Sequence, residues 1–250
     1  MNIKKNLIWS LIPAKSNSKR VPKKNLKKID GINLFLYSCV FSKMHYLIKR
    51  TFVSTDSKII KRLAISFSAE VPFLRPKNIS KNFSQDYEYV HDFLSKIKKK
   101  EKFLPEFIIQ LRPTTPFRSI QIINKAIKKI KLFPKSTSLR SCHIADHPPE
   151  KQFRIKNNYY CDINLKKINN EKFNIPSQNF KYAYEPNGYV DILKTSYLLK
   201  NKKRIYGHKI LPLVTKKTLD IDTIEDFQMA QKSDPREKKI ILKEYYKIKK

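Results

Sequence analysis

A basic loop of small residues near the N-terminus carries the residues best suited to chemistry. Lys15, Lys19 and Lys24 follow an apolar run over 7–13 that is typical of a buried strand. Ammonium groups and free backbone N–H groups at the end of a strand suit an anionic ligand such as a nucleoside triphosphate. The Gly-Lys-Ser/Thr sequence that begins the helix of a P-loop is absent, and a solvated turn is the alternative in a chain with 44 Lys.

A pair of acids near the C-terminus is the second candidate. Asp220 and Asp222 are two residues apart, so an extended segment would point both carboxylates to one face. Mg²⁺ typically takes one or two carboxylates and completes its shell with phosphates and water. The alternative is that these acids favour the positive end of the helix for which Thr223 and Asp226 form a capping box. The spacing alone leaves both readings open.

The elements that must position these residues alternate between short apolar runs and longer amphipathic stretches. Strands are predicted over 7–13, 51–54, 71–74, 107–111, 189–193 and 209–214. Helices are predicted over 34–47, 57–67, 87–97, 120–132, 196–199 and 223–231. This order indicates an α/β fold with a mostly parallel sheet flanked by helices. Ligands of such sheets lie beyond the C-terminal ends of the strands, where polar residues follow several of the predicted strands.

Two segments depart from this rhythm within what we predict to be a single domain over 1–250. Residues 136–184 show little periodicity and read as an insertion that extends from the sheet. Residues 236–250 form a Lys-rich C-terminal tail with some helical apolar spacing, which we interpret as solvated or partly frayed.

Composition limits the classes of function. The net charge of +33 raises nucleic acid as a partner, but the excess Lys is spread along the whole chain, so we expect no nucleic-acid partner. No segment is long and apolar enough to span a bilayer, and we expect no membrane contact and a cytoplasmic location. The three Cys indicate neither a disulfide framework nor a zinc site.

Five ordered blocks of residues together resemble the acylneuraminate cytidylyltransferases, also called CMP-sialic acid or CMP-nonulosonic acid synthetases. The blocks are Lys24–Asn25, Val53–Asp56, Leu74–Pro76, Arg112–Arg118, and Pro186–Gly188 followed by Asp220–Thr223. The resemblance covers nearly the whole chain. It implies a Rossmann-like fold of the nucleotide-diphospho-sugar transferase type, with a small dimerisation insertion over 136–184.

The implied reaction joins CMP from CTP to the anomeric hydroxyl of a nonulosonic (sialic-type) acid and releases pyrophosphate, with Mg²⁺ or Mn²⁺ as cofactor. By resemblance, the CTP-binding residues are Lys15, Ser18, Lys19, Lys24, Asn25 and Arg75. Lys24 and Asp222 would be catalytic, and Asp220 with Asp222 would bind the metal. The base that deprotonates the sugar is either Asp222 or a metal-bound hydroxide.

The sugar pocket is where this chain departs from the family. By resemblance, Arg112, Gln178 and Asn187 would contact the sugar, and Lys151 would reach the partner's active site in a homodimer. Position 112 is Gln in the sialic acid enzymes, so Arg there suggests a contact to a carboxylate or an N-acyl group. We therefore expect a legionaminic- or pseudaminic-type acid rather than N-acetylneuraminate.

Three alternatives remain at this stage. A cytidylyltransferase for the eight-carbon acid Kdo, or for another sugar acid, would share the fold and the CTP chemistry. A catalytically inactive relative that acts as a scaffold and a basic nucleic-acid-binding protein belong to different classes. The intact acid pair and the lysine loop favour an active enzyme.

Overall fold

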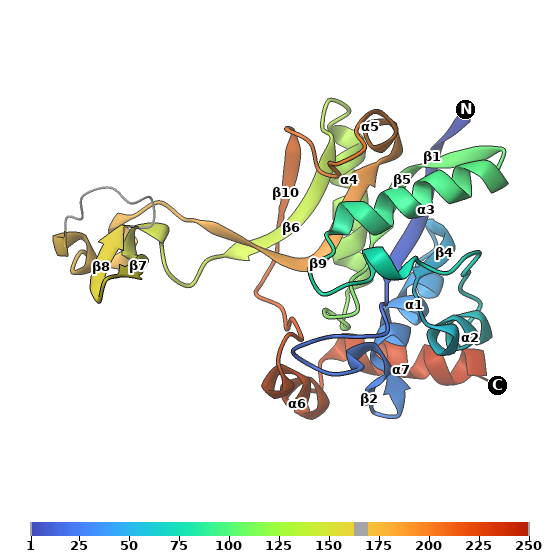
Figure 1. Cartoon of the computed structure of the whole chain (residues 1–250), viewed down its shortest axis with the longest axis horizontal. Helices are drawn as coiled ribbons and strands as arrows, with labels where there is room; N and C mark the ends of the chain where they lie inside the picture. The colour runs from blue at the N-terminus through green and yellow to red at the C-terminus, as the bar shows by residue number, and fades with distance from the viewer. Residues whose placement is uncertain (1, 163–169, 250) are drawn as a thin grey trace.

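A six-stranded sheet forms the centre of the computed structural model, which describes residues 2–162 and 170–249 (Figure 1). In sheet order the strands are β10 (Ile210–Val214), β6 (Ser138–Ile144), β9 (Tyr184–Lys194), β5 (Phe103–Gln110), β1 (Asn2–Pro13) and β4 (Ile48–Ser54). β1 pairs in parallel with β4 and β5, and β10 pairs in parallel with β6. β9 runs antiparallel between β5 and β6. The predicted α/β class with a mostly parallel sheet is confirmed.

Helices cover both faces of this sheet. The α-helices are α1 (Leu34–Met44), α2 (Lys58–Ser66), α3 (Asp86–Lys100), α4 (Ile120–Leu132), α5 (Thr195–Lys200), α6 (Ile224–Lys232) and α7 (Arg236–Lys249). Side chains alternate along β1, so Ile8 and Ile12 join one hydrophobic core and Trp9 and Leu11 join the other. The first core is closed by α1, α2, α4, α6 and α7, and the second by α3 and α5.

The shorter elements lie between these. Three short 3-10 turns, η1 (Lys24–Leu26), η2 (Lys77–Ile79) and η3 (Pro149–Lys151), precede η4 (Asn170–Phe173) and η5 (Ser177–Asn179). Two small hairpins pair β2 (Lys28–Ile29) with β3 (Ile32–Asn33), and β7 (Phe153–Lys156) with β8 (Tyr159–Asp162). Among the described residues no helix is long and apolar enough to cross a membrane.

The strand predicted over 71–74 is wrong. Only Glu70, just before it, makes an isolated parallel bridge, to Phe52 of β4. Pro72 and Pro76 lack the backbone N–H that a sheet ladder needs, which explains why the apolar run stays outside the sheet. The segment instead leads along the end of β4, where the Arg75 N–H donates to the Thr55 carbonyl at 2.7 Å.

The C-terminal residues do not form a frayed tail. They form α7, which packs against the body through Ile241 and Tyr245, and the Tyr245 ring stacks on Phe67 with centroids 4.7 Å apart. The buried Lys238 ammonium donates to Asp30 at 2.8 Å and to the Ser233 carbonyl at 2.7 Å. These contacts fix the helix in spite of its high Lys content.

The predicted insertion begins with a strand of the central sheet, because β6 lies between β10 and β9. The chain leaves the body after Ile144 and returns at Tyr184, and the described residues between them, 145–162 and 170–183, form a projection that we call the arm (Figure 1). The described part of the arm holds its own small cluster, in which the Phe153 ring stacks on Tyr160 with centroids 3.8 Å apart. The dimerisation role of this segment stays a prediction.

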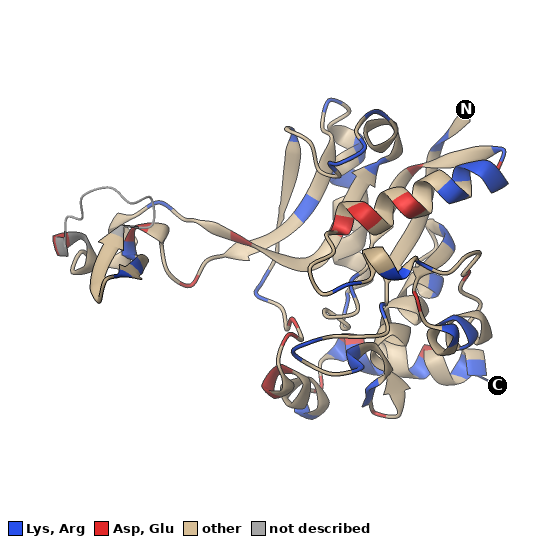
Figure 2. Cartoon of the chain, viewed as in Figure 1, with Lys and Arg blue, Asp and Glu red and all other residues tan. Residues whose placement is uncertain are grey.

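Charge is spread over the body. Figure 2 shows Lys and Arg on many helices and loops, with Asp and Glu gathered at the start of α3 and on α6. The loop that follows β1 carries several of the basic residues.

Candidate active site

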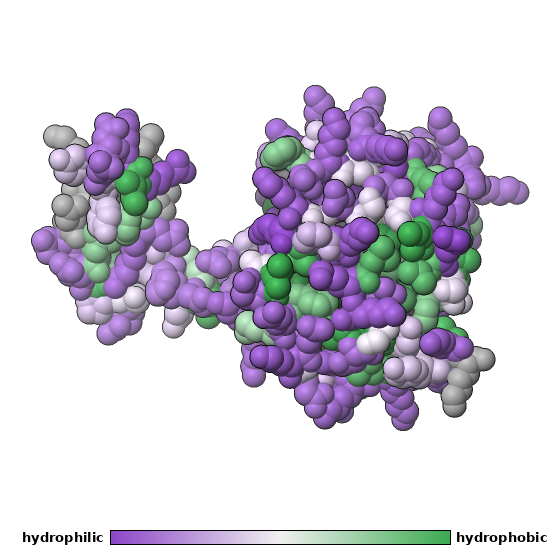
Figure 3. Space-filling model, turned by 60° about the horizontal axis from the view of Figure 1, so that its bottom comes forward, coloured by the Kyte–Doolittle hydropathy of each residue, from purple (hydrophilic) through white to green (hydrophobic). Residues whose placement is uncertain are grey.

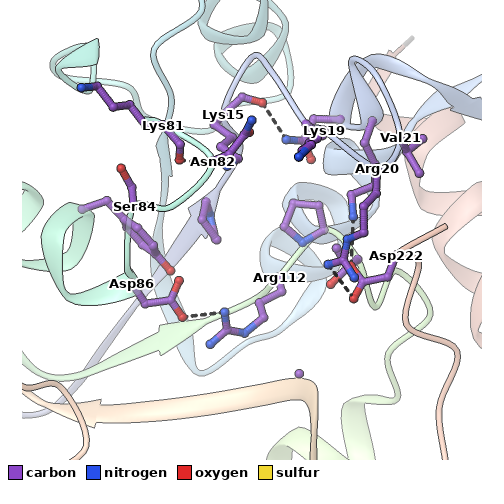
Figure 4. A pocket seen from close by; sticks show the side chains of 18 of the residues that line it. Lys15, Lys19, Arg20, Val21, Lys81, Asn82, Ser84, Asp86, Arg112 and Asp222 are labelled. Atoms are coloured by element: carbon purple, nitrogen blue, oxygen red, sulfur yellow. Dashed lines mark hydrogen bonds and ion pairs between the residues drawn. The ribbon is translucent and has the colours of Figure 1, made fainter. Parts of the chain in front are cut away.

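A cleft of about 620 Å³ lies at the C-terminal ends of β1 and β5. One wall is the basic loop over 15–25, and an adjoining wall is formed by residues 112–114 with Asp220 and Asp222. A third side is the segment over 79–86 that leads into α3 (Figure 4). The lining residues that the sequence predicted for the site are Lys15, Ser18, Lys19, Lys24, Asn25, Arg75, Arg112, Asp220 and Asp222. The topology of the sheet therefore brings together residues that lie about two hundred positions apart.

Hydrogen bonds hold the basic loop in shape. The Ser16 backbone N–H and hydroxyl donate to the two oxygens of Asp56 at 2.7 and 2.6 Å. The buried Asn25 amide donates to the Lys15 carbonyl at 2.9 Å, so Asn25 ties the two ends of the loop together. Val21 is buried and anchors the middle. Because Asp56, Asn25 and Val21 fix the backbone of the loop, the lysine side chains that line the cleft are not needed to hold it in place.

The lysines of the loop are poised for an anion. Burial lowers the pKa of Lys15, and the neighbouring Arg75 lowers it further. Burial also lowers the pKa of Lys24, although Asp222 partly offsets this effect. The Lys24 ammonium donates to the Ile221 carbonyl at 2.6 Å and lies 3.4 Å from an Asp222 oxygen. Burial removes water from these ammonium groups and so disfavours their charged form. A phosphate group in the cleft would stabilise that charged form again.

The two acids face the cleft because the residue between them is anchored. Ile221 is buried, and its N–H donates to the Thr114 carbonyl at 2.8 Å. The start of α6 is capped by Thr223 and Asp226, whose side chains exchange hydrogen bonds with each other's backbone N–H groups. The N-terminus of this helix is thus capped by Thr223 and Asp226. Asp220 and Asp222 are not needed to stabilise it, which weakens that alternative role for the acid pair.

The acid pair suits a divalent cation that is also held by phosphates. Burial in the cleft raises the pKa of the Asp220 carboxyl and repulsion from Asp222 adds to it, although Asp220 as a whole stays solvent-exposed. A cation would relieve both effects. Among the described residues no group of three or more His, Cys, Asp or Glu could hold a metal. Two carboxylates and a triphosphate are the donor set that Mg²⁺ commonly takes.

Arg75 is fixed at the end of β4 by its own guanidinium. This group donates to the Ser54 hydroxyl at 3.0 Å and to the Ser54 carbonyl at 2.6 Å, and it lies 4.6 Å from the Tyr89 ring centroid. Burial lowers the pKa of Arg75. The residue lines the cleft beside Lys15, which fits its predicted position next to the nucleotide.

Arg112 is held between two carboxylates. Its Nη1 donates to Asp86 at 2.6 Å, and its Nη2 donates to Asp191 at 2.8 Å and to the Tyr206 hydroxyl at 3.1 Å. Burial alone would lower the pKa of Arg112, but Asp191 and Asp86 outweigh it and raise that pKa well above its usual value. We call Asp86, Arg112 and Asp191 the clamp. Both terminal nitrogens of Arg112 are engaged inside the protein before any sugar arrives.

The side chains of three predicted sugar residues do not line the cleft, although Asn187 stands between Pro186 and Gly188, which do. Asn187 is buried, and its amide donates to the Thr215 hydroxyl at 2.7 Å while its carbonyl accepts from the Tyr189 N–H at 3.2 Å. Gln178 in η5 and Lys151 in η3 belong to the arm and do not line this cleft. A contact of either with the cleft of a second chain stays a prediction.

The sequence analysis missed residues that the structure places in the cleft or directly behind it. Arg20 and Asp86 line the cleft, and Asp191 supports it from behind. Gly188 has φ +65, and a Cβ there would lie 3.4 Å from Arg112 Cδ and 3.7 Å from an Asp220 oxygen. The signal for Arg20 was its place among the loop lysines; Asp191 carried none, since a lone acid in an apolar strand has no local marker.

A basic loop beside a carboxylate pair, in a cleft at the C-terminal strand ends of a mostly parallel sheet, is the arrangement expected of a nucleotidyltransferase site. The family model described as "Cytidylyltransferase" matches residues 9–249. The chain belongs to the cytidylyltransferase family, and the predicted resemblance is confirmed.

Curated relatives match over most of the chain. The CMP-N,N'-diacetyllegionaminic acid synthase of Legionella pneumophila is 28% identical over 90% of this chain and 95% of its own length. The N-acylneuraminate cytidylyltransferase of Escherichia coli is 27% identical over 89% of this chain, which spans about half (51%) of that protein. The pseudaminic acid cytidylyltransferase of Campylobacter jejuni is 24% identical over 88% of this chain and 93% of its own.

Solved structures support the fold. The CMP:2-keto-3-deoxy-manno-octonic acid synthetase complexed with CTP is 13% identical, with a TM-score of 0.64 over 90% of this chain and 97% of that one. A 4-diphosphocytidyl-2C-methyl-D-erythritol synthase is 10% identical, with a TM-score of 0.63 over 91% and 98%. The predicted Rossmann-like nucleotidyltransferase fold is confirmed.

Proposed function

We propose that the protein transfers CMP from CTP to the anomeric hydroxyl of a nonulosonic acid. As the anomeric oxygen forms a bond to the α-phosphorus of CTP, its proton passes to a base, for which Asp222 is the candidate. The bond between the α-phosphorus and the bridging oxygen breaks, and pyrophosphate leaves with the electron pair of that bond. The observation that carries the proposal is that the lysine loop and the acids Asp220 and Asp222 line one cleft. The named activities of the sequence relatives supply the substrate class.

The roles of the residues follow from their charges. Lys15, Lys19 and Lys24 hold the triphosphate, which requires positioning and charge stabilisation more than covalent chemistry from the protein. Asp220 and Asp222 would hold Mg²⁺ or Mn²⁺, which neutralises charge on the phosphates when bound. Only 11% of the Lys24 side chain is exposed, and this buried side chain holds its ammonium group beside Asp222.

We further propose a legionaminic- or pseudaminic-type acid as the sugar. Two relatives that the chain covers almost end to end act, by their names, on these acids. Arg112 lines the cleft, but its charge is shared with the other two residues of the clamp, Asp86 and Asp191. The wall therefore presents both the Asp86 carboxylate and the edge of the guanidinium to the sugar. Such a wall suits hydroxyl and N-acyl N–H donors of the sugar.

A homodimer is part of this proposal. Ile155, Tyr159 and Tyr182 of the arm are each more than 70% exposed, and these are apolar or amphipathic side chains. Figure 3 shows the arm as a lobe joined to the body by a narrow neck, with hydrophobic side chains among polar ones. A second copy of the chain would cover them and could receive Gln178 and Lys151 of its partner. A cytoplasmic location, where CTP is available, also stays a prediction.

The test is a pyrophosphate-release assay with CTP and a panel of sugar acids. The panel contains legionaminic, pseudaminic and N-acetylneuraminic acids and Kdo. We expect turnover with one of the first two, and loss of that turnover in Asp222→Asn but not in the control Asp234→Asn, which removes an exposed carboxylate outside the cleft. Kdo as the best substrate would favour the eight-carbon alternative. CTP binding without turnover of any acid would favour an inactive relative.

A further inference from the structure

Arg20 forms an ion pair with Asp222, one of the two carboxylates that would hold the divalent cation in the proposed function. Its Nη2 lies 2.9 Å from one Asp222 oxygen, while the Lys24 ammonium lies 3.4 Å from the other (Figure 4). Both oxygens of Asp222 are therefore paired with cations of the basic loop. A divalent cation that binds Asp222 must displace one of them, because like charges repel at this range.

Of these two cations, Arg20 is the one that can move. Its side chain is 67% exposed, whereas that of Lys24 is 11% exposed and also bonds to the Ile221 carbonyl. The neighbouring Val21 is buried, so the backbone of Arg20 stays in place while its side chain turns. An exposed ion pair of this kind is weak and breaks readily.

A triphosphate offers Arg20 a better partner. Lys15, Ser18 and Lys19 of the same loop line the cleft on which the phosphates would bind, so the guanidinium is within the same basic wall. A guanidinium binds phosphate oxygens in a forked, bidentate manner, and such charge-assisted hydrogen bonds are stronger than those in an exposed pair with one carboxylate oxygen.

We propose that Arg20 is a positioning residue that holds Asp222 while the cleft lacks nucleotide and transfers to phosphate oxygens of CTP when CTP binds. The transfer frees Asp222 for the divalent cation, so CTP and the cation each favour the binding of the other. This inference rests on the proposed function. It adds that the cation site is completed by the nucleotide in two ways, through the phosphate oxygens and through the removal of Arg20.

The test measures binding rather than turnover. Mn²⁺ is titrated into nucleotide-free wild-type, Arg20→Ala and Arg62→Ala proteins, with free Mn²⁺ followed by electron paramagnetic resonance, and CTP is titrated by calorimetry in EDTA. We expect Arg20→Ala to bind Mn²⁺ up to about fivefold more tightly, the range of an exposed ion pair. CTP affinity should fall roughly tenfold or more, as for a lost charge-assisted hydrogen bond. Arg62 is an exposed arginine outside the cleft, so Arg62→Ala should match wild type in both titrations.

Two further variants separate this proposal from a general effect of charge. In an Asp222→Asn background, Arg20→Ala should no longer strengthen Mn²⁺ binding, because the partner of Arg20 is gone. Arg20→Lys should recover part of the CTP affinity, since it keeps the charge and loses the fork. Equal Mn²⁺ and CTP affinities in wild-type and Arg20→Ala proteins would overturn the proposal and leave the proposed function standing. A wild-type protein that binds Mn²⁺ but no CTP would overturn both.

Discussion

Replacing Arg112 by Gln should destabilise the fold far more than its position at a cleft wall suggests. The clamp joins three segments, since Asp86 begins α3, Arg112 follows β5 and Asp191 lies in β9. Removing the guanidinium leaves Asp191, which is 1% exposed, as a buried carboxylate without its main partner. The remaining neighbours are Arg140, with its Nε at 3.5 Å, and the Tyr206 hydroxyl at 3.0 Å.

The magnitude follows from this burial. Breaking a buried ion pair by removal of one partner costs about 3–5 kcal/mol, because the other charge stays buried and uncompensated. Since Arg140 and Tyr206 still approach Asp191, we expect the free energy of unfolding to fall by the lower figure, ~3 kcal/mol. For a chain of this length that loss lowers the melting temperature by roughly 6–12 °C.

The measurement is urea unfolding followed by circular dichroism and by fluorescence. The chain has a single Trp, Trp9, which is buried in β1 and reports on the centre of the sheet. The double variant Arg112→Gln/Asp191→Asn should recover most of the lost stability, because it removes the unpaired charge as well.

A matched control is Asp86→Asn, which removes the other carboxylate of the same clamp. Asp86 is 34% exposed, so its loss should cost no more than about 1 kcal/mol, as for an exposed ion pair. Our reasoning would be refuted by an Arg112→Gln protein as stable as wild type. A double variant less stable than Arg112→Gln would refute it equally.

Four further predictions concern the site, the assembly and the C-terminal helix. Lys24→Ala should keep its circular dichroism spectrum and lose most turnover, whereas Lys23→Ala, which removes an exposed lysine outside the cleft, should retain it. Asp222→Asn should slow single-turnover product formation at saturating Mg²⁺ more than it weakens CTP binding, and equal rates at saturating metal would remove Asp222 from the site. Light scattering should report about twice 29.7 kDa, and an active monomer at nanomolar concentration would contradict the role of the arm. Tyr245→Ala should lower the free energy of unfolding by about 3 kcal/mol, as for a buried aromatic side chain, while the exposed Tyr246→Ala should change it little, and a chemical denaturation series compares the two.

The central strands could be predicted because their sequences are nearly continuous apolar runs. Residues 7–13 of β1 and 107–109 of β5 are of this kind, whereas residues 2–6, which begin β1, are mostly polar and were not predicted. β6 was missed because Ser138, Ser141 and His143 interrupt its pattern although all three are buried. The Ser138 hydroxyl donates to the Tyr206 carbonyl, and the Ser141 hydroxyl accepts from the Val190 N–H, so partners from other segments make this polar strand possible.

The cleft could be predicted in outline and not in its pairings. Residues that follow parallel strands meet at one edge of the sheet, which is enough to bring the lysine loop towards Arg112. The pairs Arg20–Asp222 and Arg112–Asp191 depend on how distant segments pack, and nothing in the local sequence indicates which residues pair. The α7 helix was misjudged for a related reason: its helical apolar spacing was seen, but the surface that Tyr245 packs on, which includes Phe67, is far away in the sequence.

The antiparallel strand at the centre of the sheet dictates the order in which the chain can fold. β5 has β1 on one side and β9 on the other, so β4, β1 and β5 can assemble as soon as the first part of the chain has been synthesised. The other edge of β5 then stays unpaired until the ribosome has made Lys194, and such an apolar edge is open to wrong pairing in the meantime. Joining β9 to β5 is a long-range and therefore slow closure. Because Asp191 arrives on β9 and Arg112 waits at the end of β5, this closing step is also the one that assembles the clamp and completes the wall of the cleft.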